Sequence, residues 1–302
     1  MTGERLGVLG VGRMGLPICA RLVAADFRVA AYDIRSALQR SVENVGATWA
    51  ADSAALAASV DIVITVLPGA AELEQAMAGP TGVVRQLAPG SCWLDLTSND
   101  PRVARTLAGL ATAGSIDSVG APMGGGVDAA VSGALTFFVG GTASAIERVR
   151  PVLNALGGPD ALRLVGADVD AAHTAKLLAN LLWFGQAAAT TEALLLGQSL
   201  GLDLRRLRTA LGSSAGGSAF LDRHLDYLLA GDYLETFGLD RCVDELEIVT
   251  ALAAEQGVPF ELSALVTRLH EQALARFGAV DGELLVAKLL EERAGRQLRA
   301  DG

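Results

Sequence analysis

Three glycines near the start of the chain are spaced two and three residues apart, in the run Gly10-Val11-Gly12-Arg13-Met14-Gly15. A short apolar segment precedes the run and an amphipathic one follows it, as a turn between a strand and a helix requires. There the first glycine permits the tight bend, the second lets a pyrophosphate approach the backbone, and the third lets helix and strand pack closely. We predict a dinucleotide site with contacts from Gly10, Gly12, Arg13, Met14 and Gly15.

An acidic residue, Asp33, ends the next apolar segment, 18 residues beyond Gly15. A carboxylate at this place accepts hydrogen bonds from the adenosine ribose hydroxyls and repels a 2′-phosphate. Ile34 and Arg35 follow it, and the cation of Arg35 would weaken that discrimination. The pattern predicts NAD as the preferred cofactor, NADP as the alternative, and contacts from Asp33, Ile34 and Arg35.

Lys176 and Asn180 are four residues apart in Ala171–Thr191, a stretch nearly free of charge. Residues at this spacing share one face of a helix. The neighbouring residues are mostly leucines, and removal from water fits a lysine for proton transfer near neutral pH. We therefore expect Lys176 to donate or accept a proton, with Asn180 beside it.

The elements that must position these residues alternate in the first half of the chain. Helix-length segments separate several short apolar runs, which predict strands at Leu6–Gly10, Arg28–Asp33, Asp61–Leu67, Cys92–Leu96, Ser115–Val119, Thr136–Gly140 and Leu162–Val165. This alternation is typical of an α/β Rossmann fold with a doubly wound parallel sheet. Only helical patterns follow, beginning with one long helix over Val169–Leu200. We predict a dinucleotide-binding domain at 1–165 and an all-helical domain for substrate and subunit contacts at 166–302.

The composition excludes several classes of protein. The chain has 302 residues, 51% hydrophobic and 19% charged, with a net charge of −10 and no basic block, so nucleic acid is not an expected partner. Polar residues interrupt Leu177–Leu202, the best candidate for a membrane span, so we expect none. The three cysteines and three histidines lack metal-ligand spacing, which argues against a metal site or disulfides. Together with the absence of a signal-peptide pattern at Met1–Gly12, this predicts a cytoplasmic protein.

The stretch Leu177–Leu202 is nevertheless apolar on almost every side. A helix of this kind must be covered all round, which one small domain can hardly do. We therefore expect a subunit interface along it, in a homodimer or a homotetramer.

Five segments together resemble the β-hydroxyacid dehydrogenase family, which includes 3-hydroxyisobutyrate dehydrogenase and tartronate semialdehyde reductase. They are Gly10–Pro17, Val66–Pro68, Asp95–Pro101, Ala121–Gly125 and Lys176–Asn180, and the resemblance covers nearly the full length. It implies a Rossmann domain joined to a helical domain, and hydride transfer at C4 of a nicotinamide.

The same resemblance assigns roles to particular residues. It implies that Lys176 transfers the proton and that Asn180 orients the substrate or the lysine. Cofactor contacts would come from Leu67, Pro68, Thr97 and Ser98, and substrate contacts from Met123, Gly124 and Gly125.

Three positions depart from the family pattern. Gly124 replaces a substrate-loop serine, so only backbone donors remain there, and Ala179 replaces the first of two asparagines. Counting from Phe237, Asp244 and Glu245 stand where the family has Lys-Asp. We hypothesise a pocket poor in positive charge, with substrate contacts from Phe237 and Asp244, and a less anionic substrate, larger, neutral or amine-bearing.

Two alternatives remain open. Imine reductases and reductive aminases share the two-domain plan but generally carry Asp or Tyr in place of the lysine; Lys176 opposes this alternative and Asp244 favours it. The departures also agree with a dinucleotide-binding protein that has lost catalysis, whereas the intact glycine run and Lys176 oppose that interpretation. Activity on a cyclic imine that survives Lys176→Ala would favour the first, and cofactor binding without turnover the second.

Overall fold

The computed structural model describes residues 3–235 and 237–299. The chain divides into two compact units, Met1–Lys176 and Leu177–Gly302, and the division falls within helix α8, Val169–Ser199. We call them the N-terminal unit and the C-terminal unit. The outer ends of the two predicted domains, at residues 1–2 and 300–302, lie outside the described part of the chain.

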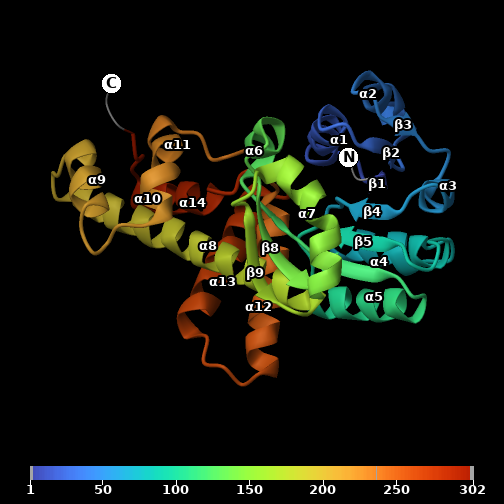
Figure 1. The fold of residues 1–302 in the computed structure, drawn as a ribbon. Coiled ribbons are helices and arrows are strands. Elements are labelled where there is room, and N and C mark those ends of the chain that lie inside the picture. Colours follow the sequence, from blue (N-terminus) through green and yellow to red (C-terminus); the bar gives the residue numbers. More distant parts are fainter. Residues whose placement is uncertain (1–2, 236, 300–302) are drawn as a thin grey trace. The chain divides into compact units, whose positions relative to one another are not determined.

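One sheet forms the centre of the N-terminal unit. Its strands lie in the order β3-β2-β1-β4-β5-β6-β8-β7, with β9 paired to β8 (Figure 1). Every pairing from β3 to β6 is parallel, which is the arrangement of the predicted Rossmann fold. The strands are β1 Arg5–Leu9, β2 Arg28–Tyr32, β3 Thr48–Trp49, β4 Ile62–Thr65, β5 Cys92–Asp95, β6 Asp117–Gly120, β7 Met123–Gly124, β8 Thr136–Gly141 and β9 Leu162–Gly166.

The sheet is mixed beyond β6. Strand β8 runs antiparallel to β6 and β7, and β9 runs parallel to β8. A parallel return needs a crossover of about a dozen or more residues, whereas β7 is joined to β8 through the short helix α6, Gly126–Ser132. Gly125 and Gly133 flank α6 in the left-handed region, at φ +112° and +76°. Glycine adopts this backbone without steric cost, and the chain can reverse direction here.

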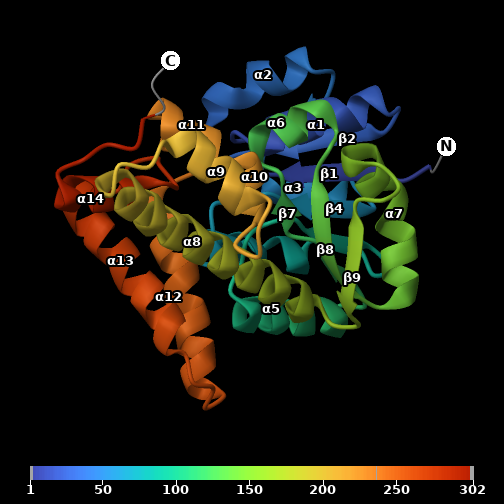
Figure 2. The same cartoon turned by 90° about the vertical axis from the view of Figure 1, so that its left-hand side faces the viewer.

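Helices cover both faces of the sheet (Figures 1 and 2). Alternate strand residues point to opposite faces, so Ile62 and Ile64 pack with α1 and α7, while Val63 packs with α4 and α5. The buried surface on both sides explains the continuous apolar runs of the sequence. The helices are α1 Gly15–Ala24, η1 Ser36–Leu38, α2 Gln39–Asn44, α3 Ser53–Ala58, α4 Ala70–Ala78, η2 Val83–Arg85, α5 Pro101–Ala113, α6 and α7 Ala143–Gly157.

The described part of the C-terminal unit is helical, apart from an isolated bridge between Gly238 and Asp281. The predicted long helix is present as α8 and is followed by α9 Leu204–Gly212, α10 Ala219–Arg223, α11 Leu225–Ala230, α12 Leu239–Glu255, α13 Glu261–Phe277 and α14 Leu285–Ala294. Helices α12 and α13 lie side by side (Figure 2). Two apolar clusters hold the unit together, one containing residues of α10, α11 and α14 and one containing residues of α12 and α13.

One face of α8 in the C-terminal unit is exposed. We call it the α8 stripe; it consists of Leu178, Leu182, Ala189, Ala193, Leu196 and, just beyond the helix, Leu200. Its four leucines expose between 45% and 72% of their surface. Within the described residues, no helix has both the length and the hydropathy that crossing a membrane takes.

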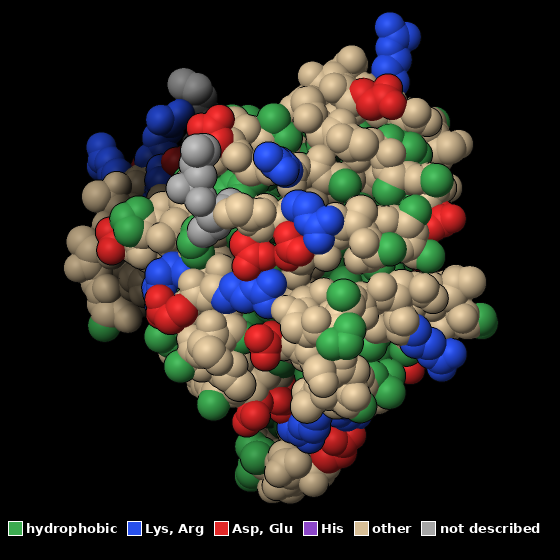
Figure 3. All heavy atoms as spheres, turned by 45° about the vertical axis from the view of Figure 1, so that its right-hand side comes forward, with side chains coloured by type: hydrophobic (Ala, Val, Ile, Leu, Met, Phe, Trp, Pro, Cys, Tyr) green, Lys and Arg blue, Asp and Glu red, His purple; other side chains and the backbone are tan. Residues whose placement is uncertain are grey.

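Surface charges are often paired. Arg5 binds Asp61 at 2.7 Å, Arg148 binds Glu4 at 2.9 Å, and Arg276 binds Glu292 at 2.9 Å. On the face drawn in Figure 3, acidic and basic side chains are interspersed and do not gather in separate areas. This face offers no broad basic area.

Candidate active site

The carboxyl ends of parallel strands bring the predicted loops of the N-terminal unit to one edge of the sheet. Beyond those ends, Val66 N donates to Leu9 O at 2.9 Å and Ala121 N donates to Asp95 O at 2.7 Å. The glycine run after β1 and the segments after β4, β5 and β6 therefore share this edge. Doubly wound folds bind their ligands in the crevice outside such strand ends.

The glycine run forms the tight turn between β1 and α1. Gly10 has φ +93°, and a Cβ on it would lie 2.3 Å from Val66 O. A Cβ on Gly15 would lie 2.0 Å from Gly10 O, so helix and strand meet too closely for any side chain. At Gly12 the space is open, because a Cβ there would meet only the guanidinium of Arg35, at 3.3 Å. A phosphate can approach the backbone at Gly12.

Helix α1 begins directly at this turn. Its N-cap residue, Met14, makes no side-chain hydrogen bond to the helix. The first N–H groups of such a helix need an acceptor, and the helix dipole favours an anion there. Arg13 is exposed at the same turn. The turn, the open approach at Gly12 and the uncapped helix fit the pyrophosphate of NAD or NADP.

Asp33 follows β2 with a buried carboxylate. Its Oδ2 accepts a hydrogen bond from Val11 N (2.9 Å) and one from Arg35 Nη2 (2.9 Å). Its Oδ1 accepts from Arg35 N (3.0 Å) and Arg35 Nε (2.9 Å). Burial acts to raise the pKa of Asp33, but the hydrogen bonds from Arg35 and Val11 outweigh it and lower the pKa. Asp33 is therefore ionised at neutral pH, and Arg35 offsets part of its charge.

Ile34 lies between these two residues with 90% of its surface exposed. A large apolar side chain in water offers a surface for a flat ring, and Arg35 keeps its guanidinium beside Gly12. An acid, a cation and an apolar surface thus meet at the end of β2, the place that an adenosine takes in a Rossmann fold.

A buried polar network lies at the ends of β4 and β5. Asp95 Oδ1 accepts hydrogen bonds from Thr65 Oγ1 (2.7 Å) and Thr97 N (3.0 Å). Trp93 Nε1 donates to Thr65 Oγ1 at 2.9 Å, and Leu67 N donates to Thr97 Oγ1 at 3.1 Å. The network fixes the segment after β4 to the segment after β5. These two segments carry Pro68, which is exposed, and Ser98, which is half-buried.

His173 of α8 faces the same network. Its ring is fully buried, and Nε2 lies 3.4 Å from Asp95 Oδ2. Burial lowers the pKa of His173, so the ring is neutral at neutral pH. Lys176 is three residues further along α8, on the next turn, and is half-buried. The helix that carries the lysine is therefore seated on the cofactor edge of the sheet.

The segment after β6 forms a glycine-rich loop. Met123 and Gly124 make up β7, and Gly124 pairs with Thr136 of β8. A Cβ on Gly124 would lie 2.8 Å from Thr136 Oγ1. The hydroxyl of Thr136 therefore fills the space that a side chain at position 124 would take. Gly125 is exposed next to it with φ +112°.

The remaining predicted residues belong to the C-terminal unit. Asn180 of α8 donates a hydrogen bond from Nδ2 to Glu245 Oε2 of α12, at 2.6 Å. Asp244 is exposed and lies 3.4 Å from Arg241 Nη1. Phe237 packs at the edge of the apolar cluster that contains Leu177 and Cys242. Within this unit, Asn180 is paired with a buried acid.

Two residues of the site were missed by sequence reasoning. His173 stands three residues before Lys176 and so shares its helix face, a signal that was available. Thr136 faces Gly124 only because β7 pairs with β8, and a two-residue strand leaves no pattern in the sequence. Glu245 was noted as a family position, but its bond to Asn180 was not expected.

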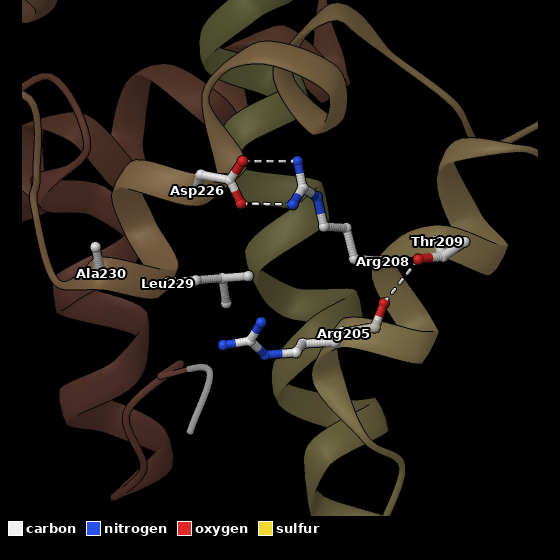
Figure 4. Close-up of a pocket in the computed structure, with 6 residues that line it drawn as sticks. All are labelled: Arg205, Arg208, Thr209, Asp226, Leu229 and Ala230. Atoms are coloured by element: carbon white, nitrogen blue, oxygen red, sulfur yellow. Dashed lines mark hydrogen bonds and ion pairs between the residues drawn. The ribbon is translucent and has the colours of Figure 1, made fainter. Parts of the chain in front are cut away.

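A cavity of about 360 Å³ in the C-terminal unit contains none of the predicted residues. It lies between α9 and α11 and is lined by Arg205, Arg208, Thr209, Asp226, Leu229 and Ala230 (Figure 4). Arg208 is bound to Asp226 by two hydrogen bonds, of 2.5 and 2.8 Å. Because Asp226 neutralises its charge, Arg208 would attract an anion in this cavity only weakly.

Comparisons with known proteins agree with this arrangement. The family model described as the NAD binding domain of 6-phosphogluconate dehydrogenase matches residues 5–172. A second, described as NAD-binding of NADP-dependent 3-hydroxyisobutyrate dehydrogenase, matches residues 170–290. The chain is 30% identical to 2-(hydroxymethyl)glutarate dehydrogenase of Eubacterium barkeri over 96% of both chains.

Solved structures share the fold. A 3-hydroxyisobutyrate dehydrogenase from Mycobacterium tuberculosis, solved with L-serine, has a TM-score of 0.85 at 24% identity and covers 95% of this chain and 99% of its own. An imine reductase variant from Myxococcus stipitatus is more distant, with a TM-score of 0.63 at 21% identity over 96% of this chain and 100% of its own. The glycine turn and the two matching family models identify the chain as an NAD(P)-dependent dehydrogenase that acts on a CH–OH group and belongs to the β-hydroxyacid dehydrogenase family.

Proposed function

We propose that the protein interconverts the alcohol group of a β-hydroxyacid-like substrate and the corresponding aldehyde or ketone. This proposal rests on the residues that meet at one edge of the sheet in the N-terminal unit. This edge gathers the glycine turn, the loops after β4 and β5, and the helix turn that precedes Lys176. Hydride transfer needs a nicotinamide next to a proton donor. These elements would bind the cofactor at the same edge on which the helix with Lys176 is seated.

The cofactor would be held by the residues of this edge. Gly10, Gly12, Arg13, Met14 and Gly15 would bind the pyrophosphate, and Asp33, Ile34 and Arg35 the adenosine. Leu67, Pro68, Thr97 and Ser98 would face the nicotinamide half, which accepts or supplies hydride when the cofactor is bound. The buried Asp33 supports NAD as the preferred cofactor, because a 2′-phosphate would be repelled.

Lys176 would transfer the proton. In the reducing direction its ammonium donates a proton to the carbonyl oxygen, and in the oxidising direction the neutral amine accepts the hydroxyl proton. One hydride and one proton then account for both hydrogens of the reaction. Asn180 would orient the substrate, and its bond to Glu245 fixes the direction of its amide.

The substrate would meet backbone N–H groups at Met123, Gly124 and Gly125. We further propose that Phe237, Asn180 and Asp244 contribute to its binding. Asp244 and Glu245 are acidic where the family carries Lys-Asp, which supports a substrate less anionic than a simple hydroxyacid. The relatives named above act on hydroxyacids according to their names.

A substrate screen tests this proposal. Initial rates would be measured with NADH and NADPH against small 3-hydroxycarboxylates, their semialdehydes, and larger neutral or amine-bearing analogues. We expect turnover of alcohol or carbonyl substrates, with the highest kcat/KM on a less anionic member. The best kcat/KM on a small 3-hydroxycarboxylate would contradict the substrate assignment, and no turnover of any alcohol or carbonyl would contradict the reaction.

An imine reductase activity is the second candidate, favoured by the acid at Asp244 and by the fold likeness to the imine reductase. It predicts reduction of a cyclic imine that survives Lys176→Ala. Loss of that activity together with carbonyl reduction in the same variant would exclude a lysine-independent imine site.

We also propose that the protein is a homodimer or homotetramer joined along the α8 stripe. Contiguous exposed apolar surface marks an interaction site, and the stripe lies on the helix that composition singled out. In this proposal residues 1–165 bind the cofactor and 166–302 supply substrate and subunit contacts. Light scattering that gives the mass of a monomer would overturn it.

The buried free thiols of Cys19, Cys92 and Cys242 support a cytoplasmic location. Fractionation of the source cells that finds the protein outside the cytoplasm would contradict this proposal.

A further inference from the structure

His173 is a buried titratable residue that the proposed reaction does not use. None of its side-chain surface is accessible, and neither ring nitrogen makes a well-formed hydrogen bond to a described residue, although the backbone of Thr97 acts to raise the pKa of the ring. Nε2 points at Asp95 Oδ2 from 3.4 Å, beyond the usual 2.7–3.2 Å of an N–H···O bond. Buried polar groups without partners cost stability and call for an explanation.

Charged groups face the imidazole from several elements. Asp95 approaches from β5, and Asp170 and Lys176 stand three residues before and after it on α8. Arg105 of α5 donates to Asp170 through Nε at 3.1 Å. Burial lowers the pKa of His173 and raises that of Asp95. Asp95 Oδ1 accepts two hydrogen bonds, and Asn99 Nδ2 lies 3.5 Å from Asp95 Oδ2.

The sheet leaves little room for α8 to move at this point. A Cβ on Gly120, the last residue of β6, would lie 2.6 Å from Val169 O and 3.0 Å from His173 Nε2. The first turn of α8 therefore rests directly on β6, and His173 reaches past it to β5. The ring of His173 therefore lies between α8 and the ends of β5 and β6.

We propose that His173 and Asp95 are positioning residues that set the place of Lys176 relative to the nicotinamide-side loops. From Asp95 the hydrogen bonds continue to Thr97 N, and Thr97 Oγ1 accepts from Leu67 N. The same carboxylate thus fixes both the loops assigned to the cofactor and the helix turn before the proton donor. This inference rests on the proposed role of Lys176.

The variants His173→Leu, His173→Gln and Asp95→Asn test it in the full-length enzyme. Misplacing reacting groups by about 1 Å costs on the order of a hundredfold in rate. We expect His173→Leu to lower kcat by about ten- to a hundredfold and to leave the Kd for NADH within about threefold. His173→Gln, whose amide can donate to Asp95, should recover most of the rate and serves where His173→Leu does not fold.

The pH profile separates positioning from stability. Asp95→Asn changes the group that faces His173, so the helix turn with Lys176 should shift and the lysine should meet a different environment; the alkaline limb of kcat for carbonyl reduction should then move. The matched control is His270→Leu, which also removes a buried histidine, from α13. It should lower the unfolding temperature without moving kcat or the profile.

Three results would overturn the inference. A folded His173→Leu enzyme with wild-type kcat would show that the ring does not position Lys176, and an unshifted profile in Asp95→Asn would remove the role of the carboxylate. Turnover that survives Lys176→Ala would overturn the proposed proton donor and this inference with it. Turnover lost in Lys176→Ala but unchanged in His173→Leu would overturn this inference alone.

Discussion

The substitution Asp33→Asn tests the predicted preference for NAD over NADP. In the native chain the Asp33 carboxylate is buried and its two oxygens accept four hydrogen bonds, three of them from Arg35. Asparagine keeps the size and the acceptor for Val11 N but removes the charge. A 2′-phosphate at this place then meets only the cation of Arg35.

The size of the effect follows from the charges. Two unit charges about 4 Å apart interact by about 4 kcal/mol at an effective dielectric constant of about 20. The Arg35 side chain is 59% exposed, so solvent screens the site and the expected change is about 1.4 to 2.8 kcal/mol. This corresponds to a gain of about ten- to a hundredfold in kcat/KM for NADPH. NADH should lose about tenfold, because neutral hydrogen bonds replace charge-assisted ones.

The assay compares kcat/KM for NADH and NADPH in the native enzyme and in three variants. Asp33→Asn should shift the ratio toward NADPH, and Arg35→Ala should lower NADPH use by about tenfold with little change for NADH. The matched control is Arg5→Ala: Arg5 also donates through N, Nε and Nη2 to one carboxylate, that of Asp61, at the opposite ends of the strands. It should leave the ratio unchanged.

Two outcomes would refute this reasoning. A native enzyme that uses NADPH better than NADH would show that Arg35 outweighs Asp33. An unchanged ratio in folded Asp33→Asn would show that the carboxylate does not face the ribose.

Three further predictions each concern the side chain of one residue. Thr136 Oγ1 fills the space of a side chain at position 124, and we propose that it also hydrogen-bonds the substrate. Thr136→Ala should then lower kcat/KM for the substrate by about tenfold, and adding Gly124→Ser should restore most of it. An unchanged kcat/KM in Thr136→Ala would contradict this role of Thr136. Burial lowers the pKa of His270 to about 4, so this residue contributes stability above about pH 6.5 that is lost as the pH falls toward 4. In denaturant titrations, the free energy of unfolding of the native chain should be about 3 kcal/mol lower at pH 4 than at neutral pH. His270→Gln should not show this decrease, and an equal decrease in that variant would contradict the assignment. Leu182→Glu should dissociate the oligomer in light scattering, while Leu262→Glu, on a leucine of α13 that is even more exposed, should not. An intact Leu182→Glu oligomer would place the interface elsewhere.

The strands and long helices could be predicted from the sequence because their patterns are strong. The run Ile62–Thr65 is buried on both sides, and the helix predicted at Val169–Leu200 is α8, Val169–Ser199. Strand β3 and strand β7 were not predicted. Each has only two residues, which is too short for alternation to appear, and each depends on a partner strand for its hydrogen bonds.

The direction of β8 could not be read from its residues either. An apolar run looks the same in a parallel and an antiparallel pairing, and the reversal depends on the glycine backbone at Gly125 and Gly133. The turn at the glycine run and the place of Lys176 on a helix were predictable because spacing carries both, while the role of Lys176 stays a prediction. The site was not predictable where contacts join distant segments, as between Asp95 and His173 or between Gly124 and Thr136.

The central claim, that Lys176 transfers the proton in an NAD(P)-dependent alcohol–carbonyl reaction, is tested most directly by the turnover of Lys176→Ala under saturating cofactor and substrate. The account predicts a kcat about a hundredfold or more below that of the native enzyme, the usual scale for a lost acid or base. Cofactor affinity should be unchanged in the same preparation, and a small primary amine in the buffer should recover part of the rate. Native kcat in folded Lys176→Ala would contradict the account.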